Sequence, residues 1–178
     1  MMLIINSHTM KKTLFLIFTI TSFSISLFAQ ESTELYNKGA KKAQFGKHEE
    51  AIELFTQAIE KDDKYLNAYL QRGFSYSLLK NYDKAIQDFD KAIDLKPDHQ
   101  WAYKNRGMTY NKLEKYDLAI KDFNIVLNMD PENHSALINR GFAKKAKGDK
   151  DGACRDWKAC KKLGSEEAKL ILKNNHCK

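Results

Sequence analysis

The C-terminal end of the chain carries the residues whose types could do chemistry, namely Cys154, Cys160, His176 and Cys177. Three thiolates and one imidazole can form a tetrahedral zinc site, and two of the thiols can instead oxidise to a disulfide. The spacing contains no Cys-x-x-Cys pair of the kind that many structural zinc sites use. We therefore expect no metal site and favour a disulfide, which requires an oxidising compartment.

The rest of the sequence offers no recognisable catalytic motif. It contains no glycine-rich phosphate loop, no HExxH zinc motif, and no Ser or Cys nucleophile with a spatially plausible His. His48, His99 and His134 fall at expected turns between helices, where a solvated side chain is the default interpretation. We predict that the chain is not an enzyme and uses no cofactor.

The N-terminal segment has the layout of an export signal. A pair of lysines precedes an apolar run over residues 13–28, and no acidic residue occurs before Glu31. This run is too short and too polar for a membrane span, and it ends in a small residue, Ala29, as signal peptides do. We predict that residues 1–29 are removed, with Met10 as an alternative start, and that the mature chain lies in the periplasm or cell envelope without an integral membrane span. An uncleaved anchor helix is the alternative.

Basic residues concentrate at the C-terminal end. Residues 141–178 contain 11 Lys or Arg and 5 Asp or Glu, whereas residues 30–140 contain 17 and 18. This end is either a solvated cap or a surface that meets an anionic partner. Nucleic acid is not an expected partner for an exported chain.

A period of 34 residues organises the chain after the N-terminal segment. The same step relates a set of glycines, a set of alanines and a set of aromatic residues, and it also separates the only two prolines. The repeats run over residues 32–65, 66–99, 100–133 and 134–167. The residues that carry the period are Gly39, Gly73, Gly107 and Gly141; Ala51, Ala85, Ala119 and Ala153; Phe55, Phe89, Phe123 and Trp157; and Pro97 and Pro131.

Each repeat is predicted to form a pair of antiparallel helices. In the second repeat, two apolar stripes have the i, i+3, i+4, i+7 spacing of helices. Gly73 and Ala85 are small where the two helices would cross closely, Phe89 is large enough to fill the gap, and Pro97 ends the second helix. Each hairpin leaves an apolar face that a neighbour must cover. We therefore expect an all-α stack of four hairpins, closed by a final helix near residues 166–173.

Three of the repeats combine an arginine in the first helix with an aspartate in the second. An unpaired charge out of water costs several kcal/mol, so this co-occurrence predicts an ion pair between the two helices of each hairpin. The alternative is that both side chains face solvent independently, and in either case their role is structural. The first repeat has Lys38 and Leu54 instead. The predicted pairs are Arg72 with Asp88, Arg106 with Asp122, and Arg140 with Asp156.

The hairpin assignment also narrows the choice of disulfide. Cys154 and Cys160 lie six residues apart on one expected helix, a rise of about 9 Å, which exceeds the limit of about 7 Å between bridged Cα atoms. Cys177 must then be the partner of one of them. Cys154 is equivalent to Ile86 and faces the following helix, whereas Cys160 replaces the inward Ala92. We predict a Cys154–Cys177 disulfide that stabilises the fold by about 3 kcal/mol.

This pattern resembles the tetratricopeptide repeat, in which 34 residues carry an aromatic residue, a Leu-Gly pair, a Tyr, and then Ala, an aromatic residue, Ala and Pro. The match covers nearly all of the chain after residue 29. Arg or Lys replaces the Leu before each glycine, and the outer repeats lack the Tyr and the proline, as terminal repeats of a capped array do. The resemblance implies a right-handed superhelical solenoid of four hairpins, with a C-terminal capping helix and tail over residues 166–178.

The resemblance further implies a binding groove. In the family, the first helix of each hairpin lines the concave face, chiefly through its second, fifth, ninth and twelfth positions. The corresponding residues here form a mainly apolar and aromatic lining: Tyr36, Leu70, Phe74, Trp101, Lys104, Met108, Asn111, Ile138, Phe142 and Lys145.

The lining favours an apolar segment over a terminal carboxylate. Relatives that grip the terminal carboxylate of heat-shock chaperones use a Lys and Asn clamp, and this chain has Lys104 and Asn139 but Met108 and Ala40 where the clamp has Asn. Large apolar side chains on a concave surface mark interaction sites. We predict an apolar peptide anchored by Trp101 together with Phe142, with Lys104 and Lys145 meeting acidic groups at its edge. The alternative is that the aliphatic and phenylalanine members of the lining only pack between adjacent first helices.

The sequence thus predicts a protein- or peptide-binding scaffold of the bacterial cell envelope. A chaperone or assembly factor for exported proteins is one alternative. A structural subunit that associates with itself is another.

Overall fold

The computed structural model describes residues 30–177, and within this range the chain is helical, with short turns and no β-strand. The predicted signal peptide and its cleavage site lie outside the described residues. None of the described helices is long and apolar enough to cross a membrane. The chain divides into two compact units, one ending at Ala68 and the other beginning at Tyr69.

The first unit contains a helical hairpin. A helix over residues 30–44 is followed by α2 (His48–Lys61), with Gly46 in the turn at a φ of 74°. Phe55 is fully buried, and a Cβ atom on Gly39 would lie only 2.8 Å from its ring. The hairpin closes because the absence of a side chain at position 39 leaves room for this phenylalanine.

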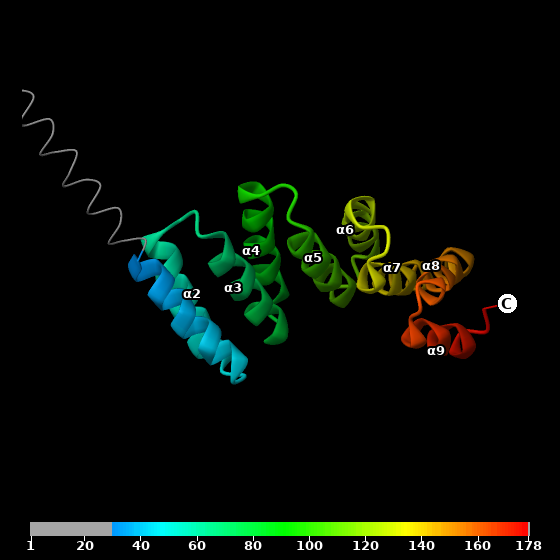
Figure 1. The fold of residues 1–178 in the computed structure, drawn as a ribbon, viewed down its shortest axis with the longest axis horizontal. Helices are drawn as coiled ribbons and strands as arrows, with labels where there is room; N and C mark the ends of the chain where they lie inside the picture. Colours follow the sequence, from blue (N-terminus) through cyan, green and yellow to red (C-terminus); the bar gives the residue numbers. More distant parts are fainter. Residues whose placement is uncertain (1–29, 178) are drawn as a thin grey trace, which may run out of the picture. The chain divides into compact units, whose positions relative to one another are not determined.

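The second unit continues the pattern of antiparallel helix pairs (Figure 1). Turns of a few residues connect the helices, and both prolines lie in these turns, where no helical hydrogen bond has to be donated. The helices are α3 (Leu66–Leu78), which begins in the first unit, α4 (Tyr82–Leu95), α5 (Gln100–Lys112), α6 (Tyr116–Met129), α7 (His134–Ala146), α8 (Lys150–Lys162) and α9 (Glu166–Asn174).

Consecutive helices from α4 to α9 pack against one another, and α5 also contacts α7. The contact between α5 and α7 places the first helices of two successive hairpins side by side, as in a solenoid. The prediction of an all-α stack of helical hairpins is therefore confirmed within the second unit, and α9 packs on α8 after the fourth hairpin.

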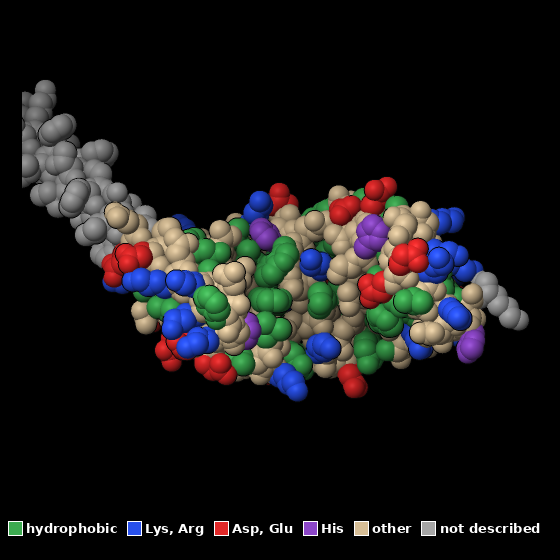
Figure 2. Space-filling model, turned by 60° about the horizontal axis from the view of Figure 1, so that its bottom comes forward, with side chains coloured by type: hydrophobic (Ala, Val, Ile, Leu, Met, Phe, Trp, Pro, Cys, Tyr) green, Lys and Arg blue, Asp and Glu red, His purple; other side chains and the backbone are tan. Residues whose placement is uncertain are grey.

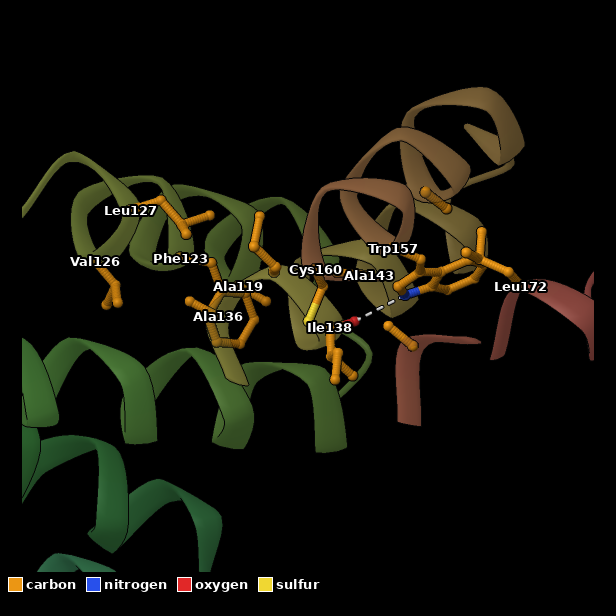
Figure 3. Close-up of a cluster of buried hydrophobic side chains, with 13 residues drawn as sticks. Ala119, Phe123, Val126, Leu127, Ala136, Ile138, Ala143, Trp157, Cys160 and Leu172 are labelled. Atoms are coloured by element: carbon orange, nitrogen blue, oxygen red, sulfur yellow. Dashed lines mark hydrogen bonds between the residues drawn. The ribbon is translucent and has the colours of Figure 1, made fainter. Parts of the chain in front are cut away.

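A buried cluster between α6, α7, α8 and α9 forms part of the core (Figure 3). Phe123 and Trp157 are fully buried in it, and the indole Nε1 of Trp157 donates a hydrogen bond to the carbonyl oxygen of Ile138 at 3.2 Å. Trp157 occupies the position that a phenylalanine holds in the other hairpins. Gly141 faces this indole, because a Cβ atom there would lie 2.3 Å from Nε1.

The turn inside each hairpin contains one residue in the left-handed backbone region. Gly46, Lys80, Glu114 and Gly148 have φ values of 74°, 60°, 58° and 90°, and they are 34 residues apart. In the third hairpin, the N–H of Lys115, which follows Glu114, donates to a carbonyl in the last turn of the first helix, the pattern that closes many helix ends. The inner hairpins therefore use side-chain-bearing residues in a conformation that favours glycine.

Candidate functional site

Three bidentate ion pairs join the helices of the second, third and fourth hairpins. Arg106 on α5 donates from Nε and Nη2 to the two carboxylate oxygens of Asp122 on α6, at 2.8 and 2.7 Å. Arg72 with Asp88 and Arg140 with Asp156 repeat this geometry at 2.7–2.9 Å. The structure thus brings together all of the arginine and aspartate residues that the sequence pairs.

The ion pairs extend into networks that the sequence analysis did not anticipate. The Nη1 atom of Arg106 donates to Asp90 on α4 at 2.5 Å, and the Nη1 atom of Arg140 donates to Asn124 on α6 at 2.7 Å. Arg106 and Arg140 therefore each link their own hairpin to the preceding one. Asp90 and Asn124 both lie 16 residues before their arginine, but this spacing crosses from one hairpin to the next and becomes meaningful only once the packing of the hairpins is known.

Burial opposes ionisation of two of the paired aspartates, Asp88 and Asp122. The Asp122 side chain is 2% exposed, and burial raises the pKa of its carboxyl, against the hydrogen bonds and positive charge of Arg106. Burial likewise raises the pKa of Asp88, against the same effects of Arg72. The arginines are thus required to keep charged carboxylates inside the hairpins, which is a structural role.

The cysteines of the C-terminal end divide into a bridged pair and a buried thiol. Cys154 on α8 is bonded to Cys177, with a Cα–Cα distance of 5.6 Å, and this bond ties the chain after α9 to the fourth hairpin. Cys160 is free and fully buried. Among residues 30–177, no three His, Cys, Asp or Glu side chains are placed to hold a metal ion.

A row of exposed apolar side chains runs along the first helices of the second unit. Phe74 on α3, Met108 on α5 and Phe142 on α7 occupy equivalent positions, each directly after the glycine that faces the second helix. Their exposed fractions are 37%, 37% and 42%. Because the glycine side of each helix is buried, the next residue points away from the partner helix. We call these three residues the apolar row.

The apolar row has aromatic and polar neighbours. Trp101 is half-buried and contacts the rings of Phe74 and Phe89, with centroids 5.8 and 6.1 Å away in tilted and edge-on arrangements. It therefore packs against Phe74 and leaves only part of its own surface exposed. Between Met108 and Phe142 lies a cavity of about 380 Å³, whose other lining residues are Asn111, Lys112, Tyr116, Asn139, Ala143 and Ala146.

Two residues of the predicted lining are buried and do not line a groove. Leu70 is 5% exposed, and Ile138 is 6% exposed and belongs to the core cluster around Trp157. For these two, packing inside the fold is the correct interpretation. Tyr36 is half-buried in the first unit, where its ring packs against Phe55 and Tyr65 at centroid distances of 5.7 and 5.1 Å.

The polar members of the predicted lining are partly engaged inside the protein. Asn111 donates from Nδ2 to the carbonyl oxygen of Asn139 at 3.1 Å and so connects α5 to α7. Lys145 donates to Asn175 Oδ1 at 2.5 Å, and Lys104 is half-buried on α5. The predicted contact of Lys104 and Lys145 with acidic groups of a peptide stays a prediction.

His99 is a residue that the sequence analysis misjudged as merely solvated. It is half-buried and caps α5, because its Nδ1 accepts a hydrogen bond from the N–H of Ala102 at 3.3 Å. Burial and the nearby charge of Lys96 lower the pKa of His99 below its ordinary value. The neutral imidazole is the form that can accept this bond.

Comparison with known families identifies two of the repeats. The family model described as "Tetratricopeptide repeat" matches residues 66–99 and 101–133. No curated protein matches the sequence.

Solved structures of similar fold include a crystal structure of MamA, with 24% identity, a TM-score of 0.73, and coverage of 78% of this chain and 81% of that chain. The first TPR of Spaghetti (RPAP3), bound to the HSP90 peptide SRMEEVD, has 29% identity and a TM-score of 0.66, with 67% and 95% coverage. The first TPR domain of human RPAP3 has 28% identity and a TM-score of 0.65, with 69% and 97% coverage. The likeness to MamA shows the fold alone.

Proposed function

Because this chain is a tetratricopeptide-repeat protein, we propose that it binds an apolar segment of another protein along the apolar row of its second unit. Repeats of this family generally mediate contacts between proteins. The observation that carries the proposal is that Phe74, Met108 and Phe142 repeat one exposed position on three successive first helices. Phe74 and Phe142 each pack one side of their ring against a tryptophan of the fold, at centroid distances of 5.8 and 5.4 Å. The remaining apolar surface of the row is exposed, and exposed apolar surface repeated along successive helices points to a partner.

The cavity beside Met108 and Phe142 supports an apolar side chain as the anchoring group. Its volume of about 380 Å³ accommodates one large side chain, and the flexible thioether of methionine adapts to different shapes. The side-chain oxygen Oδ1 of Asn111, which lines the cavity, is buried and accepts no hydrogen bond within the described part of the chain, so it is available to an N–H group of a peptide. The solved RPAP3 repeat that carries a peptide offers a parallel for the mode of binding, although its ligand is a charged one.

The proposed compartment is the cell envelope. The export-type segment over residues 1–29 supports it. The Cys154–Cys177 disulfide also supports it, because such bonds persist in oxidising compartments. N-terminal sequencing of the protein from its native cells is expected to begin at Gln30, and an intact Met1 or Met10 would contradict export by cleavage.

A photo-crosslinking experiment tests the binding surface. A photoreactive phenylalanine analogue placed at position 108 in the full chain is expected to crosslink to a partner segment in the native cells. The same analogue at position 118 on α6, where Leu118 is also exposed at 43%, is the matched control. Equal crosslinking from both positions would remove the apolar row from the proposal, and a crosslink to a second copy of the chain would favour self-association.

The crosslinked segment can then be synthesised and titrated against variants of the full chain. We expect Phe142→Ala to weaken its affinity by about 30-fold, as truncation of an anchoring aromatic residue does. The control Leu118→Ala should leave the affinity unchanged. Trp101→Ala is less informative, because Trp101 packs against Phe74 and Phe89 of the preceding hairpin and its loss disturbs the contact between the two hairpins. Unchanged affinity of a folded Phe142→Ala variant would contradict the proposal.

A further inference from the structure

A basic surface covers α8 and α9 at the C-terminal end of the second unit, where Figure 2 shows Lys and Arg side chains gathered. Two neighbouring hollows lie on it, and they share Lys158 and Cys177. The larger, of about 530 Å³, has a lining without any acidic side chain: Lys158, Lys161, Lys162, Lys169, Leu172, Lys173 and Cys177. Its five lysines come from α8 and α9, and the disulfide joins Cys154 of α8 to Cys177, which follows α9.

The charges of this surface are weakly compensated from within the protein. Lys169 pairs with Glu166 one turn away at 3.3 Å, and both side chains are largely exposed. For Lys161, Lys162 and Lys173, the described part of the chain provides no ion pair. In the first unit, by contrast, Lys42 and Lys47 both pair with Glu50. Holding several like charges together is unfavourable, so an external anion would relieve the repulsion.

The choice of lysine over arginine indicates what kind of anion fits. Each of the three buried carboxylates inside the hairpins is held by a bidentate arginine, and in the fourth hairpin Lys144 also pairs with Asp156 at 2.8 Å. The basic residues that line the larger hollow are all lysines. A lysine side chain is a mobile, hydrated point charge and lacks the planar guanidinium group with which arginine binds a fixed carboxylate. Lysines on a broad surface suit a diffuse layer of negative charge.

An exposed leucine lies on α9 next to the lysines of this surface. Leu170 on α9 is 63% exposed and stands between Lys169 and the lysine one turn later, Lys173. Neighbouring Leu172 is buried and anchors α9 to the core cluster. Lysines next to an exposed apolar side chain suit the surface of a bilayer, where anionic headgroups can contact the lysines and the acyl chains below them can accept the apolar side chain.

We propose that the α8–α9 surface is a docking site for a bilayer that contains anionic phospholipid. The lysines contact the headgroup phosphates, and Leu170 enters the interfacial layer. The proposal is independent of the peptide-binding function, because no residue of this surface belongs to the apolar row. A chain bound in this way would hold its peptide-binding helices close to a membrane without spanning it.

Vesicle co-sedimentation of the full chain tests the proposal. We expect binding to phosphatidylcholine vesicles that contain about 30% phosphatidylglycerol to exceed binding to phosphatidylcholine vesicles by about tenfold or more. This difference should disappear when the salt concentration is raised from about 0.05 M to about 0.5 M, because exposed charges are then screened. Comparing variants within the full chain keeps the contribution of residues 1–29 constant.

A fourfold charge reversal of Lys161, Lys162, Lys169 and Lys173 to Glu is expected to abolish the preference for anionic vesicles. The matched control reverses Lys91, Lys96, Lys115 and Lys121, which are also exposed and change the net charge by the same amount. The control should retain the preference. Leu170→Ala should weaken binding about threefold to tenfold, the loss expected when most of one exposed apolar side chain is removed.

Several results would overturn the proposal. Equal losses in both fourfold variants would show that only total charge matters. Displacement by soluble glycerol phosphate would indicate a discrete phosphate site and no bilayer docking. If anionic vesicles are not preferred but an acidic polypeptide such as polyglutamate binds and is lost in the first variant, the surface belongs to an acidic protein partner.

Discussion

The first and third hairpins share one architecture but differ in what joins their helices. In both, a phenylalanine of the second helix lies against a glycine of the first, with a Cβ-to-ring distance of 2.8 Å for Gly39 and 3.0 Å for Gly107. Only the third hairpin adds a bidentate ion pair, Arg106 with Asp122. At the position equivalent to Arg106, the first hairpin has Lys38, which pairs instead with Glu34 on its own helix at 2.7 Å.

This comparison indicates that the aromatic contact with glycine is what closes a hairpin, whereas the ion pair is an addition. A buried ion pair contributes little net stability, because the desolvation of both charges offsets their attraction. The raised pKa of Asp122 points the same way, since burial outweighs the favourable effect of Arg106. The arginine can nevertheless select which helices meet, because it also bonds to Asp90 of the preceding hairpin.

The largest expected change in the free energy of unfolding comes from removing one member of a buried ion pair and leaving the other in place. Arg106→Leu leaves Asp122 buried without its partner, and we expect the free energy of unfolding to fall by about 3 kcal/mol. The equivalent change in the first hairpin, Lys38→Leu, should alter it by less than about 0.5 kcal/mol, because the Lys38 ion pair is exposed. Urea denaturation followed by circular dichroism measures both. Similar losses in the two variants would contradict the distinction between the hairpins.

Converting the third hairpin to the composition of the first is the control for that variant. The double variant Arg106→Lys with Asp122→Leu copies Lys38 and Leu54, and it removes the buried charge together with its partner. We expect its stability to lie within about 1 kcal/mol of the native protein, since replacing both members of a buried pair is often neutral or stabilising. A double variant as unstable as Arg106→Leu would show that the pair itself stabilises the hairpin.

A smaller loss of stability is expected at Gly141, where the contact between the glycine and the aromatic ring is tightest. In Gly141→Ala, the new methyl group would lie 2.3 Å from Trp157 Nε1, so the indole must move and its hydrogen bond to Ile138 is strained. We expect a loss of about 2 kcal/mol. Gly107→Ala is the matched variant, in which a looser contact and the better helix propensity of alanine nearly cancel. Thermal unfolding of both variants checks the difference, and a more stable Gly141→Ala would refute the overpacking argument.

Substitutions in the hairpin turns are expected to change the free energy of unfolding by about 1 kcal/mol or less. Glu114 has a φ of 58°, which is unfavourable for a residue with a side chain, so Glu114→Gly should stabilise the third hairpin by about 0.5–1 kcal/mol. Gly148→Ala, at the equivalent turn of the fourth hairpin with a φ of 90°, should destabilise it by about 1 kcal/mol. Chemical denaturation is the measurement, and effects of the same sign in both variants would rule out this explanation.

The smallest effect concerns the helix caps of the second unit. Because the pKa of His99 is lowered in the folded protein, its contribution to stability is complete above the unfolded pKa of about 6.5 and is lost as the pH falls through the lowered value. NMR titration should place the His99 pKa below 6.5. His99→Asn, which copies the Asn133 cap of α7, should remove this pH dependence. A His99 pKa above 6.5 would show that its ring is not held as a neutral acceptor.

The sequence alone determined the hairpin architecture, because the helical spacing and the 34-residue period involve residues close along the chain. It also identified the residues of the ion pairs and of the Cys154–Cys177 disulfide, since helix geometry limits which side chains can meet. Only the tertiary structure decided which apolar residues are available to a partner. Ile138 and Phe142 lie one helical turn apart on the same apolar stripe of α7, yet Ile138 is buried in the core cluster and Phe142 is 42% exposed.

The reason is that burial depends on neighbouring helices. Periodicity shows that a residue lies on an apolar face of its own helix, but the helices packed against that face determine how much of it they cover. The same limit hid the link between Arg106 and Asp90, which exists only because α4 packs beside α5. Spacing within one hairpin could be read from the chain, whereas contacts between hairpins required the folded structure.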